Sequence, residues 1–158
     1  MAKKGSKQKW KLGAIVAIPL PGKKFAFAKL FQSLNFGVYD LVSSRIEPVD
    51  QVIKHKIVFF QAARDSAIKS GQWPIIGEEP FPDEEAAWAP PKITVLTAGD
   101  KIDPKFVRLS HKGKLQPGTP KDIAGMDLDF FADDLDAFVE IIVDRVIKGQ
   151  HEKYQVPR

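Results

Sequence analysis

The first 42 residues contain three short apolar segments separated by turn signals, and this spacing constrains the fold more than any other feature. Residues 14–18 are a β-branched apolar run, typical of a buried strand. Over 25–31, large residues alternate with small ones, and residues 38–42 form a third apolar run. Turn residues occur at 21–22 and at 35–37. Strands separated by such short connections predict an antiparallel meander.

A fourth strand is predicted at 57–60, running into a short helix over 62–69 that ends at Gly71. Nearer the C-terminus the pattern predicts strands at 93–96 and 106–109 and a loop over 110–120.

The middle of the chain is rich in proline. Five prolines lie between residues 74 and 91, which disfavours both a helix and a central strand there. Its aromatic residues Trp73, Phe81 and Trp88 indicate that this irregular segment packs against the rest of the fold.

The clearest helix is predicted over 133–148, with Asp133 as N-cap and Gly149 as the stop. Its apolar residues recur at spacings of three and four, which gives one apolar face: Leu135, Phe138, Val139, Ile142 and Val146. The whole pattern predicts an α+β domain, in which a twisted antiparallel sheet or small half-barrel of about five or six strands packs against the C-terminal helix.

Positive charge is concentrated at the start of the chain. Of the 24 basic residues, seven lysines lie in residues 1–24, where there is no acid, which leaves 17 basic against 20 acidic residues, a net charge of −3. We expect residues 1–10 to be a flexible basic tail and residues 11–158 to be a single domain. Because no run approaches the roughly 18 apolar residues of a membrane span, we expect a cytoplasmic protein with no membrane partner.

The sequence contains none of the usual catalytic motifs. It has no cysteine, so disulfides, thiolate metal sites and cysteine nucleophiles are excluded. Its three histidines are far apart, and no His-Glu-x-x-His, Gly-x-Ser-x-Gly or phosphate-binding glycine loop occurs. We therefore expect a binding protein with no catalytic residues, no metal and no cofactor, and not an enzyme.

Three features are candidates for binding a partner. The proline-rich segment carries an acidic cluster, formed by Glu78, Glu79, Asp83, Glu84 and Glu85. The outer face of the last helix carries Asp136, Glu140 and Asp144, although like charges four apart destabilise a helix by a few tenths of a kcal/mol. Such a face is either simply solvated or an electrostatic docking surface for a basic partner. Trp73 is either an interface residue or the anchor that holds its loop to the core.

Two stretches of the sequence resemble one known family. Residues 11–20 read Lys-Leu-Gly-Ala-Ile-Val-Ala-Ile-Pro-Leu and are followed by a Gly-Lys turn and Phe-Ala-Phe-Ala-Lys at 25–29. Residues 71–77 read Gly-Gln-Trp-Pro-Ile-Ile-Gly. This order resembles the bacterial immunity protein 26 family over about residues 11–80, except that Ala28 stands where the family pattern has a glycine.

The resemblance implies an immunity protein that binds and neutralises a co-encoded cognate toxin, for example a basic nuclease. Such a partner would be met by the acidic or aromatic surfaces named above, because nuclease toxins bind phosphate backbones with basic surfaces. The alternative is a small nucleic-acid-binding barrel that uses the basic tail with Lys23, Lys24 and Lys29. An enzyme with an unrecognised site is the least favoured hypothesis.

Overall fold

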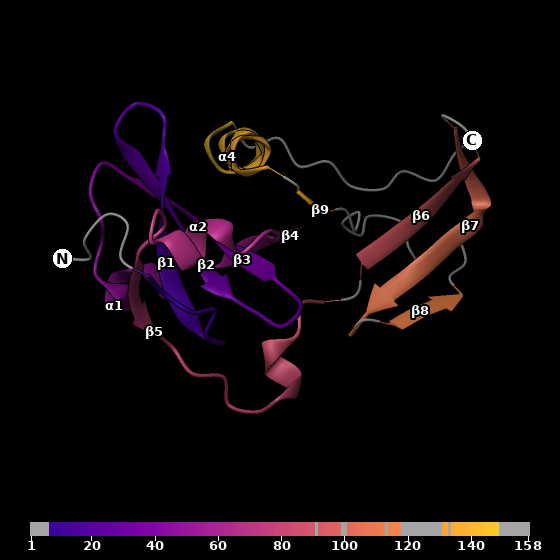
Figure 1. Ribbon diagram of the computed structural model, residues 1–158, viewed down its shortest axis with the longest axis horizontal. Helices are drawn as coiled ribbons and strands as arrows, with labels where there is room; N and C mark the ends of the chain where they lie inside the picture. The colour runs from indigo at the N-terminus through magenta and orange to yellow at the C-terminus, as the bar shows by residue number, and fades with distance from the viewer. Residues whose placement is uncertain are drawn as a thin grey trace.

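The computed structural model of the 158-residue chain describes residues 7–90, 92–98, 101–112, 114–117, 131–132 and 134–148 (Figure 1). Its main feature is a sheet in the order β5-β1-β2-β3-β4-β9. Neighbouring strands are antiparallel except β4 and β9, which are parallel. The strands are β1 (Ala14–Leu20), β2 (Lys24–Leu30), β3 (Asn35–Ser43), β4 (Ile57–Ala63), β5 (Ile75–Glu78) and β9 (Phe131–Ala132). This antiparallel sheet with a packed C-terminal helix confirms the predicted α+β class.

The meander β1-β2-β3 forms where the apolar runs predicted it, but its second turn lies earlier than expected. The chain turns at Ser33 and Leu34, both of which have a φ of 56°, and the predicted turn at 35–37 is wrong because these residues begin β3. Gly37 is required for packing, since a Cβ there would lie 2.6 Å from Cε2 of Phe31. A glycine inside a strand therefore marked a close approach and not a turn.

The sheet is buried on both faces near β1, which explains the uninterrupted apolar run in that strand. Val16 and Ile18 belong to a core that includes the C-terminal helix. Ile15 and Ala17 belong to a second cluster on the opposite face, together with Phe27, Tyr39 and Val52. The small residues of β2, Ala26 and Ala28, lie in the helix-side core.

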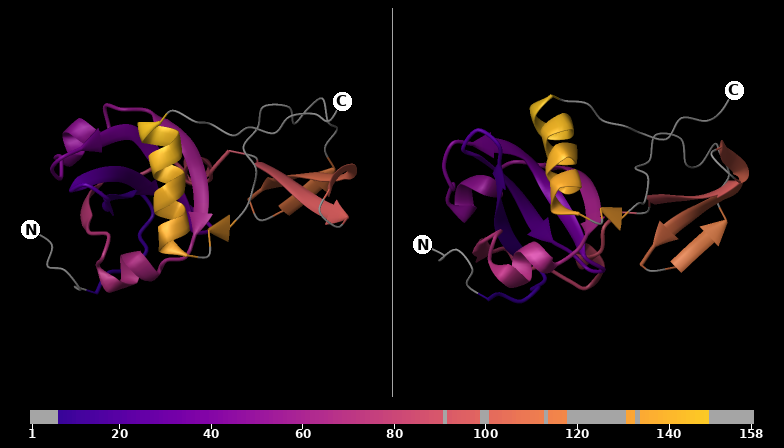
Figure 2. Two further views of the ribbon diagram at one scale, coloured as in Figure 1. Left: turned by 90° about the horizontal axis from the view of Figure 1, so that it is seen from above. Right: turned by 45° about the horizontal axis from the view of Figure 1, so that its top comes forward.

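The C-terminal helix crosses this sheet (Figure 2) and consists of α4 (Leu135–Ile142) continued by the π-helical turn η2 (Val143–Ile147). Its N-cap is Asp134, whose side chain accepts a hydrogen bond of 2.9 Å from the Ala137 amide. The prediction of Asp133 as cap is therefore wrong by one residue, because Asp134 has the extended backbone that a cap needs. Asp133 and Gly149 lie outside the described residues.

The proline-rich segment is irregular except for the edge strand β5 and the short helix η1 (Glu85–Ala87). β5 pairs with β1 alone, in keeping with the expectation that no central strand forms here. Two further short helices are α1 (Val49–Val52) and α2 (Ser66–Ser70). α2 starts later than predicted because β4 extends to Ala63, and it ends at Gly71, as predicted, with a left-handed φ of 79°.

A second sheet has the order β6-β7-β8, formed by β6 (Lys92–Ala98), β7 (Lys101–His111) and β8 (Lys114–Pro117). The strands predicted at 93–96 and 106–109 are confirmed. The loop predicted over 110–120 is wrong at 110–111 and 114–117, because β7 continues to His111 and pairs there with Lys114 of β8. Residues 113 and 118–120 lie outside the described residues. No helix in the part of the chain that the structure describes is long and apolar enough to cross a bilayer.

Candidate partner-binding surface

The acidic cluster of the proline-rich segment is largely neutralised within the fold. Glu78 forms an ion pair of 2.5 Å with Lys11, and Glu79 forms one of 2.9 Å with Lys29. The Lys29 side chain is buried, so its charge is balanced inside the protein, whereas the Lys11 pair lies at the surface. Glu78 and Glu79 therefore each form an ion pair with a lysine of the same chain.

The remaining acids of that cluster follow the same trend. Asp83 accepts a hydrogen bond of 2.8 Å from the Ala86 amide at the start of η1, and Glu85 forms an ion pair with Lys112. Glu84 is the one member of the cluster whose carboxylate forms no ion pair or hydrogen bond with the described residues. The cluster therefore has little unbalanced charge to offer a partner.

The outer face of α4 is different. The carboxylates of Asp136 and Glu140 are exposed, and neither carboxylate forms an ion pair or hydrogen bond with the described residues. Asp144, one turn further on, is half-buried and lies 3.4 Å from Lys148, as the sequence spacing allowed. This helix face thus keeps two carboxylates that the fold itself does not use.

Trp73 is 4% exposed and packs between Phe36 and Phe138, with ring centroids 5.6 and 5.4 Å away. Its location favours the role of loop anchor over that of an interface residue, since a buried indole cannot contact a partner unless the loop moves. The anchor also explains why the Trp-Pro motif lies beside the C-terminal helix.

The three lysines of the nucleic-acid-binding hypothesis lie in different environments in the fold. Lys23 and Lys24 are exposed at the turn between β1 and β2. Lys29 is 7% exposed, and its ammonium lies 4.3 Å from the centre of the Phe81 ring in addition to its contact with Glu79. Lys29 is therefore a structural cation and is not placed to bind phosphate.

Tyr39 is the ionisable residue whose pKa departs most clearly from its ordinary value. Burial raises the pKa of the Tyr39 phenol, and the negative charge of Glu79 raises it further. Tyr39 lies in the second apolar cluster. Among the described residues, no three metal-ligating side chains come together.

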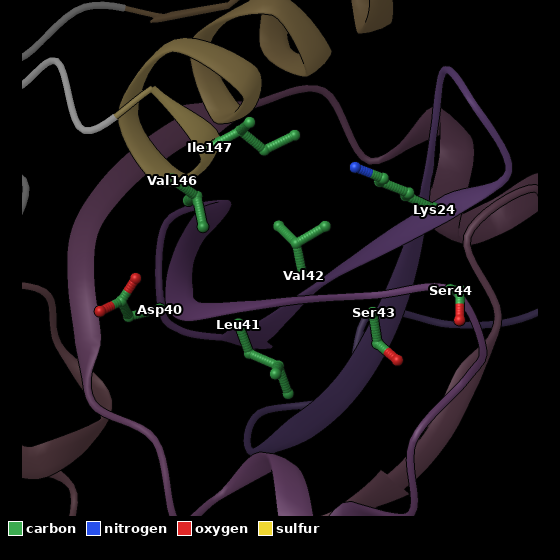
Figure 3. A pocket seen from close by; sticks show the side chains of 8 residues that line it. All are labelled: Lys24, Asp40, Leu41, Val42, Ser43, Ser44, Val146 and Ile147. Atoms are coloured by element: carbon green, nitrogen blue, oxygen red, sulfur yellow. The ribbon is translucent and has the colours of Figure 1, made fainter.

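A groove of about 270 Å³ lies between the end of β3 and the end of the C-terminal helix (Figure 3). No local pattern in the sequence predicts this groove, because its walls come from segments about 100 residues apart. The lining residues are Lys24, Asp40, Leu41, Val42, Ser43, Ser44, Val146 and Ile147.

Comparison with known families shows which family the chain is related to. The sequence model of the family described as Immunity protein 26 matches residues 11–101, which is more than half of the chain. The chain belongs to the immunity protein 26 family. The predicted resemblance is thus confirmed, and the match extends beyond residue 80 through the proline-rich segment and into β6. No curated protein and no solved structure matches the chain.

Proposed function

We propose that this immunity protein 26 family member binds a cognate protein toxin in the bacterial cytoplasm and neutralises it by occupying a functional surface, without catalysis. Family membership supports an immunity role. The observation that carries the docking proposal is that the carboxylates of Asp136 and Glu140 on α4 are exposed and have no ion-pair or hydrogen-bond partner among the described residues.

The acids of the proline-rich segment differ from those on α4 in how many have partners within the fold. Four of the five acids in that segment have partners within the fold: Glu78, Glu79, Asp83 and Glu85. On α4 the acidic residues stand four apart, where like charges cost a few tenths of a kcal/mol. The repulsion at Asp136 is offset by its place in the first helical turn, and that at Asp144 by its ion pair with Lys148. No described residue offsets the repulsion at Glu140 in this way.

A row of carboxylates on an exposed helix attracts a basic partner over several ångströms and speeds its association. Toxins that act on nucleic acid have basic surfaces because they bind phosphate. An acidic helix laid on such a surface would compete with the substrate. We therefore propose a basic toxin, with a nuclease as the leading candidate, and no cofactor.

The rival function is nucleic-acid binding through Lys23 and Lys24. Lys29 is buried in the fold and cannot serve this function, and the acidic α4 face would repel phosphate. The two functions predict opposite effects of one substitution, which makes them separable.

The test is a charge reversal at Glu140, measured against a purified candidate toxin domain chosen from the genes next to that of this protein. Glu140→Lys should slow association roughly 3- to 10-fold at low salt, and the difference should shrink as salt screens the charges. Glu84→Lys is the matched control, because it makes the same charge change at another exposed carboxylate without an ion pair. Both variants should keep wild-type stability to within about 0.5 kcal/mol.

If Glu140→Lys and Glu84→Lys slow association equally, then only the net charge of the protein affects association, and the α4 face is not part of the interface. If Glu140→Lys instead creates or tightens binding to short RNA, the rival function gains support.

A further inference from the structure

The end of β3 is an open strand edge. β4 pairs with β3 from Asn35 to Tyr39, and the last contact beyond them is the Asp40 amide donating to the Lys56 carbonyl at 2.9 Å. The residues 41–43 continue in β3 and pair on one side only, with β2. On their other side no described strand pairs with them, so their outward backbone groups can accept an added strand.

This open edge forms one wall of the groove described above. Val42 points toward Val146 and Ile147 at the end of the C-terminal helix, whereas Leu41 points away (Figure 3). Three aliphatic side chains thus face each other across the space. Ile147 is 46% exposed, the largest exposure among the big apolar residues of the described chain.

The two ends of the groove carry opposite charges. Lys24 enters from β2 on one side, and Asp40 lies on the other (Figure 3). A segment lying along β3 would therefore meet an ammonium near one end, an apolar centre, and a carboxylate near the other end. This order specifies which charges the two ends of an occupant would carry.

The groove and the surface of the proposed function share one helical element. Ile147 lies in η2, the π-helical turn that continues α4 beyond Glu140. An apolar centre bordered by charged residues is the usual composition of a protein interface.

We infer that this groove takes an extended segment of the toxin, which adds as a strand to the outer edge of β3. The segment places an apolar side chain between Val42 and Ile147, an acidic residue beside Lys24 and a basic residue beside Asp40. The inference rests on the proposed function, because it assigns to the same partner a second contact next to the α4 face.

The first experiment uses the full-length wild-type protein and the purified candidate toxin domain. Backbone amide hydrogen exchange is measured with and without the toxin. The Val42 amide, which by strand alternation points outward like that of Asp40, should exchange about tenfold more slowly in the complex.

The second experiment compares two variants with an acid introduced at an exposed apolar site. Ile147→Glu should weaken toxin binding by about tenfold or more. The matched control Leu12→Glu changes a residue of similar exposure, 37%, that does not line the groove, and should bind like wild type. Melting curves check that both variants are folded.

Each result has one meaning. Toxin binding without protection of Val42, and with equal affinity for Ile147→Glu, would overturn the groove while leaving the proposed function intact. No binding by the wild type would overturn both. If the wild type forms a dimer without toxin while the Ile147→Glu variant is a monomer, then a second copy of the chain occupies the groove, and the inference is overturned.

Discussion

The ammonium of Lys29 lies 2.9 Å from Oε1 of Glu79, and this ion pair joins the middle of the six-stranded sheet to the proline-rich segment. The Glu79 amide also donates to the Gly13 carbonyl at 2.9 Å. A Cβ on Gly13 would lie 2.8 Å from the Glu79 carbonyl oxygen, so the glycine permits this close approach. The segment is thereby held across the face of the sheet by Glu79.

Removing one partner of this pair should destabilise the fold. Glu79→Ala leaves the buried Lys29 ammonium without its carboxylate, and we expect a loss of about 1–3 kcal/mol, discounted because the Glu79 side chain is 43% exposed. Urea unfolding measures the change. The double variant Lys29→Met/Glu79→Ala should recover most of it, since the buried charge is gone, and a double variant less stable than Glu79→Ala would contradict this account.

Alkaline pH should destabilise the protein through Tyr39. Burial raises the pKa of the phenol in the folded state, so above pH of about 10 the unfolded chain loses this proton while the folded chain keeps it. Stability from Tyr39 is therefore complete below that pH and falls by about 1.4 kcal/mol per pH unit above it. Tyr39→Phe should show a shallower decline in thermal melts at pH 10–11, and parallel declines for the two proteins would show that Tyr39 ionises normally.

Gln8 should matter for stability although it lies in the segment that was expected to be a flexible tail. Its side-chain amide donates to the carbonyls of Ile68 and Trp73 at 2.9 and 3.0 Å, and its oxygen accepts from the Ile75 amide at 2.9 Å. Gln8→Ala should cost about 1–3 kcal/mol, because backbone groups are left without partners. The control is Lys9→Ala, which changes the exposed neighbouring residue. Equal melting temperatures for the two variants would show that the hydrogen bonds of Gln8 contribute little to stability.

The elements that could be predicted from sequence are those whose signals are local. The apolar runs gave the positions of β1 and β2, and the periodicity of Leu135 to Val146 gave the C-terminal helix. Errors arose where a residue type has two physical uses. Gly37 was interpreted as a turn residue, but it allows Phe31 to pack closely on the sheet.

The candidate site was harder, because charge pairing depends on contacts between distant segments. The Lys11–Glu78 pair joins residues that lie 67 positions apart, and no local pattern shows that Glu78 has a cationic partner whereas Glu140 has none among the described residues. The groove was invisible for the same reason, since Val42 and Val146 meet only in the folded chain.

Direct binding to a candidate toxin domain, chosen from the genes next to that of this protein, tests the central claim. Isothermal titration with the purified wild-type protein should give a one-to-one complex with a Kd below about 1 μM, and the same protein should restore growth to bacteria that express the toxin. A toxin domain from an unrelated gene is the control and should not bind. No heat of binding with the candidate toxin at micromolar concentration, together with tight and salt-sensitive binding to short RNA or DNA at physiological ionic strength, would contradict the account.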